Sequence, residues 1–104
     1  MVPSIGRIVH YRLGAGDADT INGRRNDAMR SLRALLRDGA VLHVGNQVKA
    51  GDVYPMMIVR VWAEEPTEST AVQGQVFLDG DDTLWVSSRQ QGDGEGQWSA
   101  PPRA

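Results

Sequence analysis

Polar and apolar residues alternate near the start of the chain, over residues 6–13, which read GRIVHYRL. Alternate side chains of a β-strand point to opposite faces, so the apolar positions of one face fall two residues apart. One face of this segment carries Val9, Tyr11 and Leu13, and the other carries Ile8 and His10. The pattern predicts a first strand with one buried face.

A helical spacing follows over residues 18–36. Apolar residues recur there three and four positions apart, at Ile21, Ala28, Leu32, Leu35 and Leu36. This stripe predicts one amphipathic helix directly after the first strand. We expect Asp17 to cap its start by accepting hydrogen bonds from free backbone N–H groups, and Gly39 to end it.

Beyond the helix, short apolar runs alternate with turn residues, which predicts a series of strands over residues 40–45, 53–63, 71–78 and 83–88. Residues 46–52 are expected to form a loop. Pro55 has no N–H, so its strand begins after it or has a free edge there. The sequence DGDD at 79–82, between two apolar runs, predicts a hairpin turn. Residues 90–104 read as a Gly- and Pro-rich tail anchored by Trp98.

These elements predict a single α+β domain over residues 1–104. One helix inserted after the first strand, followed by several short strands, favours a small antiparallel β-barrel or curled sheet, SH3-like or OB-like. Two leucines of the helix, Leu32 and Leu35, are expected to pack on the sheet. The predicted core of the sheet consists of Val59, Val61, Val76, Leu78, Leu84 and Val86.

Composition narrows the class of protein. The chain has no cysteine, which excludes disulfides, thiolate metal sites and a Cys nucleophile. No apolar run approaches the roughly 20 residues of a membrane span, and the N-terminus lacks the apolar stretch of a signal peptide. We therefore expect no membrane contact and a cytoplasmic location.

Charge is distributed unevenly. Residues 1–50 carry eight cations and four acids, and the remainder carries three cations and nine acids. Opposite halves of this kind are either solvated surface or attract each other across a self-association interface, and we predict a homo-oligomer. The overall balance disfavours nucleic acid as a partner.

Motifs for catalysis are missing from the sequence. The two histidines, His10 and His43, do not form a metal-binding pair at helical spacing, and DGDD lacks the closing Glu of a calcium loop. There is no G-x-S-x-G nucleophile elbow, and GDGEGQ is acidic and lacks the lysine of a phosphate-binding loop. The sequence predicts a protein that is not an enzyme and needs no cofactor.

Arginine beside tryptophan points to a candidate binding face. Strict alternation places Ile58, Arg60 and Trp62 on one face of their strand, and Met57, Val59 and Val61 on the core face. An indole can stack on a planar base while a guanidinium forks onto a phosphate. The ligand-binding residues predicted on this basis are Arg60, Trp62, Trp85, His10, Arg24 and Arg25.

Each of these residues also has a structural explanation. Arg60 can lie over Trp62 and pair with an acid such as Glu64. Trp85 can cover a sheet face or sit in a subunit interface, where Trp and Arg are enriched. Arg25 falls within the apolar stripe of the helix, where a charge needs a partner.

Four segments carry a resemblance that spans most of the chain: GRIVHY, GNQVKAGDVYPMMIVRVW, GQVFLDGDDTLWVSS and GEGQW. The chain resembles a family of short uncharacterised proteins encoded by tailed bacteriophages and prophages. In that family a further Trp or Pro follows the closing Trp motif, whereas this chain reads QWSAPP. The resemblance implies a phage accessory product in the host cytoplasm and carries over no catalytic residue.

Together these observations predict a non-enzymatic phage accessory protein. It would bind, and thereby sequester, a small anionic host molecule such as a nucleotide-type defence signal. The alternatives are a minor structural or assembly protein of the virion that acts through protein contacts, and an inhibitor of a host enzyme.

Overall fold

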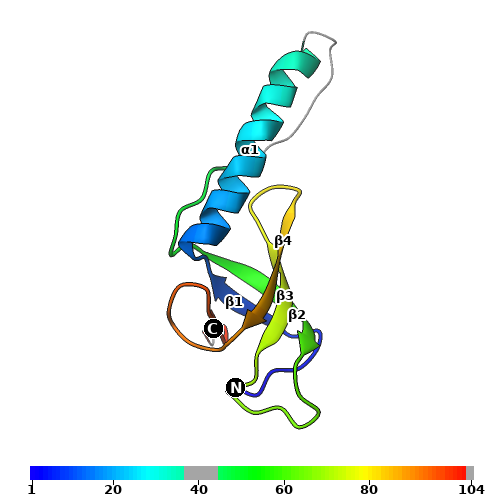
Figure 1. Cartoon of the computed structure of the whole chain (residues 1–104), viewed down its shortest axis with the longest axis vertical. Coiled ribbons are helices and arrows are strands. Elements are labelled where there is room, and N and C mark those ends of the chain that lie inside the picture. Colours follow the sequence, from blue (N-terminus) through cyan, green and yellow to red (C-terminus); the bar gives the residue numbers. More distant parts are fainter. Residues whose placement is uncertain (37–44, 103–104) are drawn as a thin grey trace.

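The structure is a computed structural model that describes residues 1–36 and 45–102, with side chains described for residues 1–30 and 45–102. One helix and one five-stranded antiparallel sheet make up the described fold, which confirms the α+β class and the helix after the first strand (Figure 1). The sheet has the strand order β4-β3-β2-β1-β5. In chain order the elements are β1 (Ile8–Arg12), α1 (Ala15–Leu36), β2 (Val53–Val61), β3 (Val72–Phe77), β4 (Thr83–Arg89) and β5 (Trp98–Ser99).

The sheet is open rather than closed into a barrel. The edge strands β4 and β5 do not pair with each other as strands, and one isolated bridge between Gln91 and Trp98 links the chain beyond β4 to β5. Of the two forms predicted, a closed barrel is therefore wrong for the described residues. The strand β5 lies within the predicted tail, because Trp98 and Ser99 pair with Tyr11 and His10 of β1.

The inner face of the sheet forms the core. Alternation predicted it correctly for β1, where Val9, Tyr11 and Leu13 are fully buried. The predicted burial of Val76, Leu78, Leu84 and Val86 is also confirmed. The first turns of α1 cover this face with Ala18 and Ile21. The rest of the helix extends beyond the sheet, which makes the molecule 54 Å long (Figure 1).

The core prediction for Val59 is wrong, and so is the assignment of Met57 to the core face and of Ile58 to the opposite face. The side chain of Val59 is 38% exposed, whereas Met56 and Ile58 are fully buried. The pairing of β2 with β3 shifts register between Ile58 and Arg60, so β2 contains one extra residue there. Such a β-bulge reverses the alternation beyond it. Val61 consequently packs against the core, and Arg60 does not share a face with Ile58.

The helix begins at Ala15, three residues before the predicted start. Asp17 still caps it, but from inside the first turn. Its Oδ2 accepts a hydrogen bond from the backbone N–H of Gly14 at 2.9 Å, while the C=O of Gly14 accepts the N–H of Ala18. In a capping box, the side chain at the third helical position accepts a hydrogen bond from the backbone N–H of the N-cap residue. Asp17 makes this contact to Gly14, which is the N-cap residue.

Two other predictions concern chain breaks. β2 includes Pro55, but at that position it pairs only with β1, so the missing N–H falls where β2 has a free edge, as predicted. The expected turn over residues 79–82 is confirmed. The strand predicted over residues 40–45, the stop at Gly39 and the packing of Leu32 and Leu35 lie outside the described backbone or side chains.

The buried Tyr11 is expected to make the folded state less stable as the pH rises into the alkaline range. Its hydroxyl donates to Oδ2 of Asp17 at 2.7 Å, and burial, followed by that carboxylate, raises the pKa of the phenol above its usual value near 10. A raised pKa in the folded state means that the stability contribution is complete below about pH 10 and is lost as pH rises further. In denaturant titrations between about pH 9 and 11, the wild type should lose more stability than Tyr11→Phe. Equal pH slopes for the two proteins would contradict this reading.

Candidate functional site

The outer face of the sheet carries large apolar side chains. Ile8, Met57, Gln75 and Trp85 form a row across four strands, since each is the register partner of the next. In an antiparallel sheet with one solvated face, the outward positions are normally polar. The outer face here includes Arg60 and the exposed apolar residues Ile8, Val53, Val59, Trp62, Phe77 and Trp85.

Arg60 and Trp62 form a stacked pair at the end of β2. The guanidinium carbon lies 4.0 Å from the centre of the indole ring, and both side chains are exposed. Beyond the bulge the backbone still pairs, because the Trp62 N–H donates to the carbonyl of Ala71. Among the residues with described side chains, Arg60 forms no ion pair, so the pairing with Glu64 that one alternative required is absent. The guanidinium therefore keeps its charge uncompensated.

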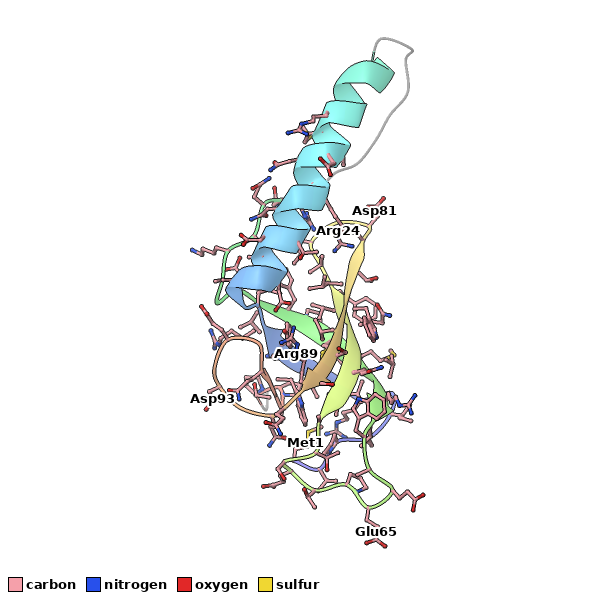
Figure 2. The ribbon with its side chains drawn as sticks, viewed as in Figure 1. Met1, Arg24, Glu65, Asp81, Arg89 and Asp93 are labelled. Atoms are coloured by element: carbon pink, nitrogen blue, oxygen red, sulfur yellow. The ribbon has the colours of Figure 1, made fainter. Side chains whose placement is uncertain are left out.

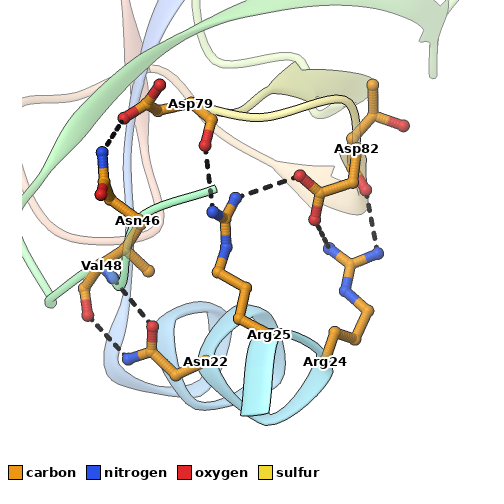
Figure 3. A network of polar contacts seen from close by, with 8 residues as sticks. Asn22, Arg24, Arg25, Asn46, Val48, Asp79 and Asp82 are labelled. Carbon is orange, nitrogen blue, oxygen red and sulfur yellow. Dashed lines mark hydrogen bonds and ion pairs between the residues drawn. The ribbon is translucent and has the colours of Figure 1, made fainter. Parts of the chain in front are cut away.

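Arg24 and Arg25 lie elsewhere, between α1 and the turn after β3 (Figure 3). Arg25 is only 3% exposed, and donates from Nη1 to the carbonyl of Asp79 and from Nη2 to Oδ1 of Asp82, both at 3.0 Å. Arg24 donates to the carbonyl of Thr83 and lies 3.9 Å from Oδ2 of Asp82. The partner that a charge in the apolar stripe requires is thus Asp82.

The same network ties down the chain that enters β2. Asn22 and Val48 exchange two hydrogen bonds, from Asn22 Nδ2 to the Val48 carbonyl at 2.7 Å and from the Val48 N–H to Asn22 Oδ1 at 2.8 Å (Figure 3). Asn46 donates to the carboxylate of Asp79. Through these contacts Arg24 and Arg25 connect the helix to the turn after β3, and only Nε of Arg25 is buried without a hydrogen-bond partner in the described part of the network.

His10 lies on the outer face, as Trp85 does, but at the other end of the sheet. It pairs with Pro55 on one side and with Ser99 on the other, at the β5 end of the sheet. Strands β2 and β3 separate it from β4, and neighbouring strands lie roughly 4.8 Å apart. The six predicted residues therefore fall into separate groups, and whether any of them binds a ligand stays a prediction.

Sequence reasoning missed Val59, Phe77 and Arg12. Phe77 is 40% exposed on the outer face, at the end of β3. Arg12 lies two residues beyond His10 on the same face of β1, so the alternation that selected His10 also contained the signal for Arg12. No sequence signal marked Val59, because the bulge follows from strand pairing.

A polar hollow lies where α1 begins. Its lining includes Asp17, Thr20, Arg89 and Glu95. Arg89 Nη2 contacts Oδ1 of Asp17 at 3.4 Å, and Tyr11 and Gly14 donate to Oδ2, so this carboxylate is already occupied as a cap. Within the part of the chain that the structure describes, no three His, Asp or Glu side chains gather in a way that would hold a metal ion.

No family model, curated protein or solved structure matches the chain. The described residues include no helix with the length and hydrophobicity that crossing a membrane requires.

Proposed function

We propose that the protein is a non-enzymatic binding protein that works as a homodimer, with the outer face as its contact surface. The observation that carries the proposal is the set of exposed aromatic side chains on this face, Trp62, Phe77 and Trp85. Arg60 stacks on Trp62 and forms no ion pair with any described side chain. Tryptophan and arginine are the residue types most enriched among residues that dominate protein interfaces.

The size of the surface fits a protein partner. An aromatic side chain carries roughly 150–250 Å² of contact area. With exposed fractions of 48% for Trp62, 40% for Phe77 and 54% for Trp85, the aromatic share alone is roughly 200–350 Å². A standard interface buries about 800 Å² on each partner, somewhat more than half of it apolar. The exposed Ile8, Val53 and Val59 extend the patch toward that size.

Charge supports a second copy as the occupant. Glu64 and Glu65 follow Trp62 after Ala63 and are exposed. Within the described residues neither acid forms an ion pair, and Arg60 does not form one either. In a two-fold interface each residue meets its complement in the partner. A copy that brings Glu64 and Glu65 of one protomer to Arg60 of the other would pair the charges around an apolar centre.

Replacing Trp85 with serine should convert the dimer to a monomer. Loss of a central Trp commonly costs 2 kcal/mol or more of binding free energy, about a thirtyfold loss in affinity. The matched control is Met29→Ser, since Met29 is 44% exposed but lies on α1. Sedimentation equilibrium measures both. A wild-type mass near 11.3 kDa at about 100 μM, or equal dissociation by the two variants, would refute the proposal.

A second candidate function is capture of a small anionic molecule by Arg60 and Trp62. The specific observation in its favour is that Arg60 stacks on Trp62 at 4.0 Å and forms no ion pair with the side chains that the structure describes. The phage resemblance supports a host-cytoplasmic setting and a nucleotide-type defence signal as the ligand. A curled five-stranded antiparallel sheet of the SH3-like or OB-like kind would suit this candidate, since OB folds bind oligonucleotides and oligosaccharides.

Calorimetric titration with linear and cyclic nucleotides tests this candidate. Arg60→Ala should lower affinity about a hundredfold, and Arg60→Lys nearly as much, because lysine lacks the planar fork. Trp62→Ala should cost about 1–3 kcal/mol of binding free energy. Arg30→Ala is the control, since Arg30 is 81% exposed on α1. Absence of binding by the wild type at millimolar concentration would eliminate the candidate.

A further inference from the structure

A hollow of about 330 Å³ lies on the outer side of β1, at its border with β5. It is lined by residues of β1, β2 and β5, of the loop between β4 and β5, and of the segment that follows β5. The lining residues that matter here are His10, Arg12, Asp93, Gln97 and Ser99. None of the residues assigned above to the dimer contact except Val53 takes part, so this site is separate from Trp85 and from the stack of Arg60 on Trp62.

The guanidinium of Arg12 is held in place by backbone groups. Nε donates to the carbonyl of Asp93 at 3.1 Å, and Nη1 donates to the carbonyl of Gly51 at 3.0 Å. The Arg12 backbone is fixed as well, because its N–H donates to the carbonyl of Gln97 at 3.0 Å and its C=O accepts from Gly96 at 2.8 Å. A guanidinium held at two nitrogens loses little further freedom when it binds a ligand.

The charge of Arg12 is not neutralised. Both of its acceptors are neutral carbonyl groups, and among the residues with described side chains Arg12 forms no ion pair. Its third nitrogen, Nη2, has no hydrogen-bond partner within that same part of the chain. A fixed cation with a free donor, on the wall of a hollow, is what recognition of an oxyanion requires.

Further donors line the same hollow. His10 and Ser99 are register partners, so their side chains are neighbours on one face, and Arg12 follows His10 on that face. The amide of Gln97 is oriented by its Oε1, which accepts the Gly94 N–H at 2.9 Å, and its Nε2 remains a donor. Imidazole, hydroxyl, amide and guanidinium N–H or O–H groups thus border one space.

We propose that this hollow binds a small oxyanion, a phosphate or carboxylate group of a small molecule, with Arg12 as the main contact and His10, Gln97 and Ser99 as further donors. The volume falls at the lower end of ligand pockets, about 300–1,000 Å³, which fits a compact ligand. The carboxylate of Asp93 is exposed on the lining and repels negative charge. It therefore favours a singly or doubly charged group over a polyphosphate.

NMR titration of the full-length chain with inorganic phosphate, and in parallel with acetate, tests the proposal and separates the two oxyanion classes. Saturable shifts are expected at the amides of His10, Arg12 and Ser99. Arg12→Gln should weaken binding at least tenfold, whereas Asp93→Asn should tighten it several-fold because it removes the opposing charge. Arg30→Ala, at a side chain that is 81% exposed on α1, should leave the affinity unchanged, and Arg60→Ala is measured alongside to separate this hollow from the stack on Trp62.

Three results would overturn the inference. The first is no saturation by either anion at about 50 mM, since a fixed guanidinium with further donors should bind more tightly than that. The second is loss of binding in Arg60→Ala with retention in Arg12→Gln, which would move the anion to the other site. The third is an Asp93→Asn protein that binds no more tightly than the wild type, a test that holds even where Arg12→Gln disturbs the local fold.

Discussion

Replacing Arg25 with alanine is expected to lower the free energy of unfolding by about 3 kcal/mol, much more than the loss of a charged residue on a helix surface usually costs. Breaking a buried ion pair by removing one partner costs about 3–5 kcal/mol. The lower end applies because the Asp82 side chain is 32% exposed while Arg25 is 3% exposed. The substitution also leaves the Asp79 carbonyl without its donor, at the point where α1 meets the turn after β3.

Arg24→Ala is the matched control, at the adjacent position and with the same acid as partner. Arg24 is 44% exposed and its closest contact to Asp82 is 3.9 Å, so its removal should cost less than about 1 kcal/mol. Urea unfolding at pH 7 measures both variants. Arg25→Lys should fall near the alanine variant, because one ammonium group cannot reach the Asp79 carbonyl and Asp82 in the geometry of a guanidinium. Equal losses for Arg24→Ala and Arg25→Ala would show that burial does not decide the effect.

Gly45 gives the same network a backbone requirement. A Cβ atom at this position would overlap the carbonyl oxygen of Asp79 and the guanidinium of Arg25. The backbone can therefore pass this close to Arg25 only if the residue there has no Cβ atom. This close approach explains why residue 45 is glycine in a segment with no regular secondary structure.

The sequence correctly predicted the features that depend only on neighbouring residues of one strand. The alternation of β1 and of β4 assigned Tyr11, Val86 and Trp85 to the correct faces, since each strand keeps its period of two. In β2 the same rule assigned Val61 correctly but put Met57 and Ile58 on the wrong faces, because the bulge between Ile58 and Arg60 depends on how β2 pairs with β3 and leaves no mark in the apolar pattern. The helix start moved to Ala15 because the cap is Gly14, whose role depends on Asp17 reaching back to it.

The candidate site followed the same division. The sequence indicated that Arg25 needs a partner, but only the fold brings Asp82, 57 residues away, to it. His10 and Trp85 were correctly assigned to one face of the sheet, yet strand order separates them. The hollow at Arg12 depends on the carbonyls of Gly51 and Asp93, which come from distant loops, and no side-chain pattern reports a backbone carbonyl.

The two-residue strand β5 was missed because it is too short to show any alternation, although its first residue is the largest of the fully buried side chains. Trp98 pairs with Tyr11 of β1, and the Trp98 N–H donates to the carbonyl of Gln90 while its C=O accepts from Gly92 (Figure 2 shows this loop around Asp93). The segment predicted to be a tail thus closes one end of the core.

Replacing Trp98 with alanine should therefore lower the free energy of unfolding by about 3–5 kcal/mol, the usual loss for a large aromatic residue in a core. For a domain of this size that corresponds to a fall in Tm of at least about 12 °C. Trp98→Phe should cost much less, because the indole Nε1 is buried without a hydrogen-bond partner in the described part of the chain, so phenylalanine loses volume but no bond.

Trp85→Ala is the control for this loss. Trp85 is 54% exposed on the outer face, so its truncation should change the stability of the monomer by about 0.5 kcal/mol at most. Thermal unfolding should be compared at a protein concentration low enough to keep every variant monomeric, since the proposed dimer would add stability of its own. Equal Tm values for Trp98→Ala and Trp85→Ala would show that the segment around Trp98 does not stabilise the core. The rigid wall that Gln97 and Ser99 give to the hollow at Arg12 would then also be in contradiction with the measurement.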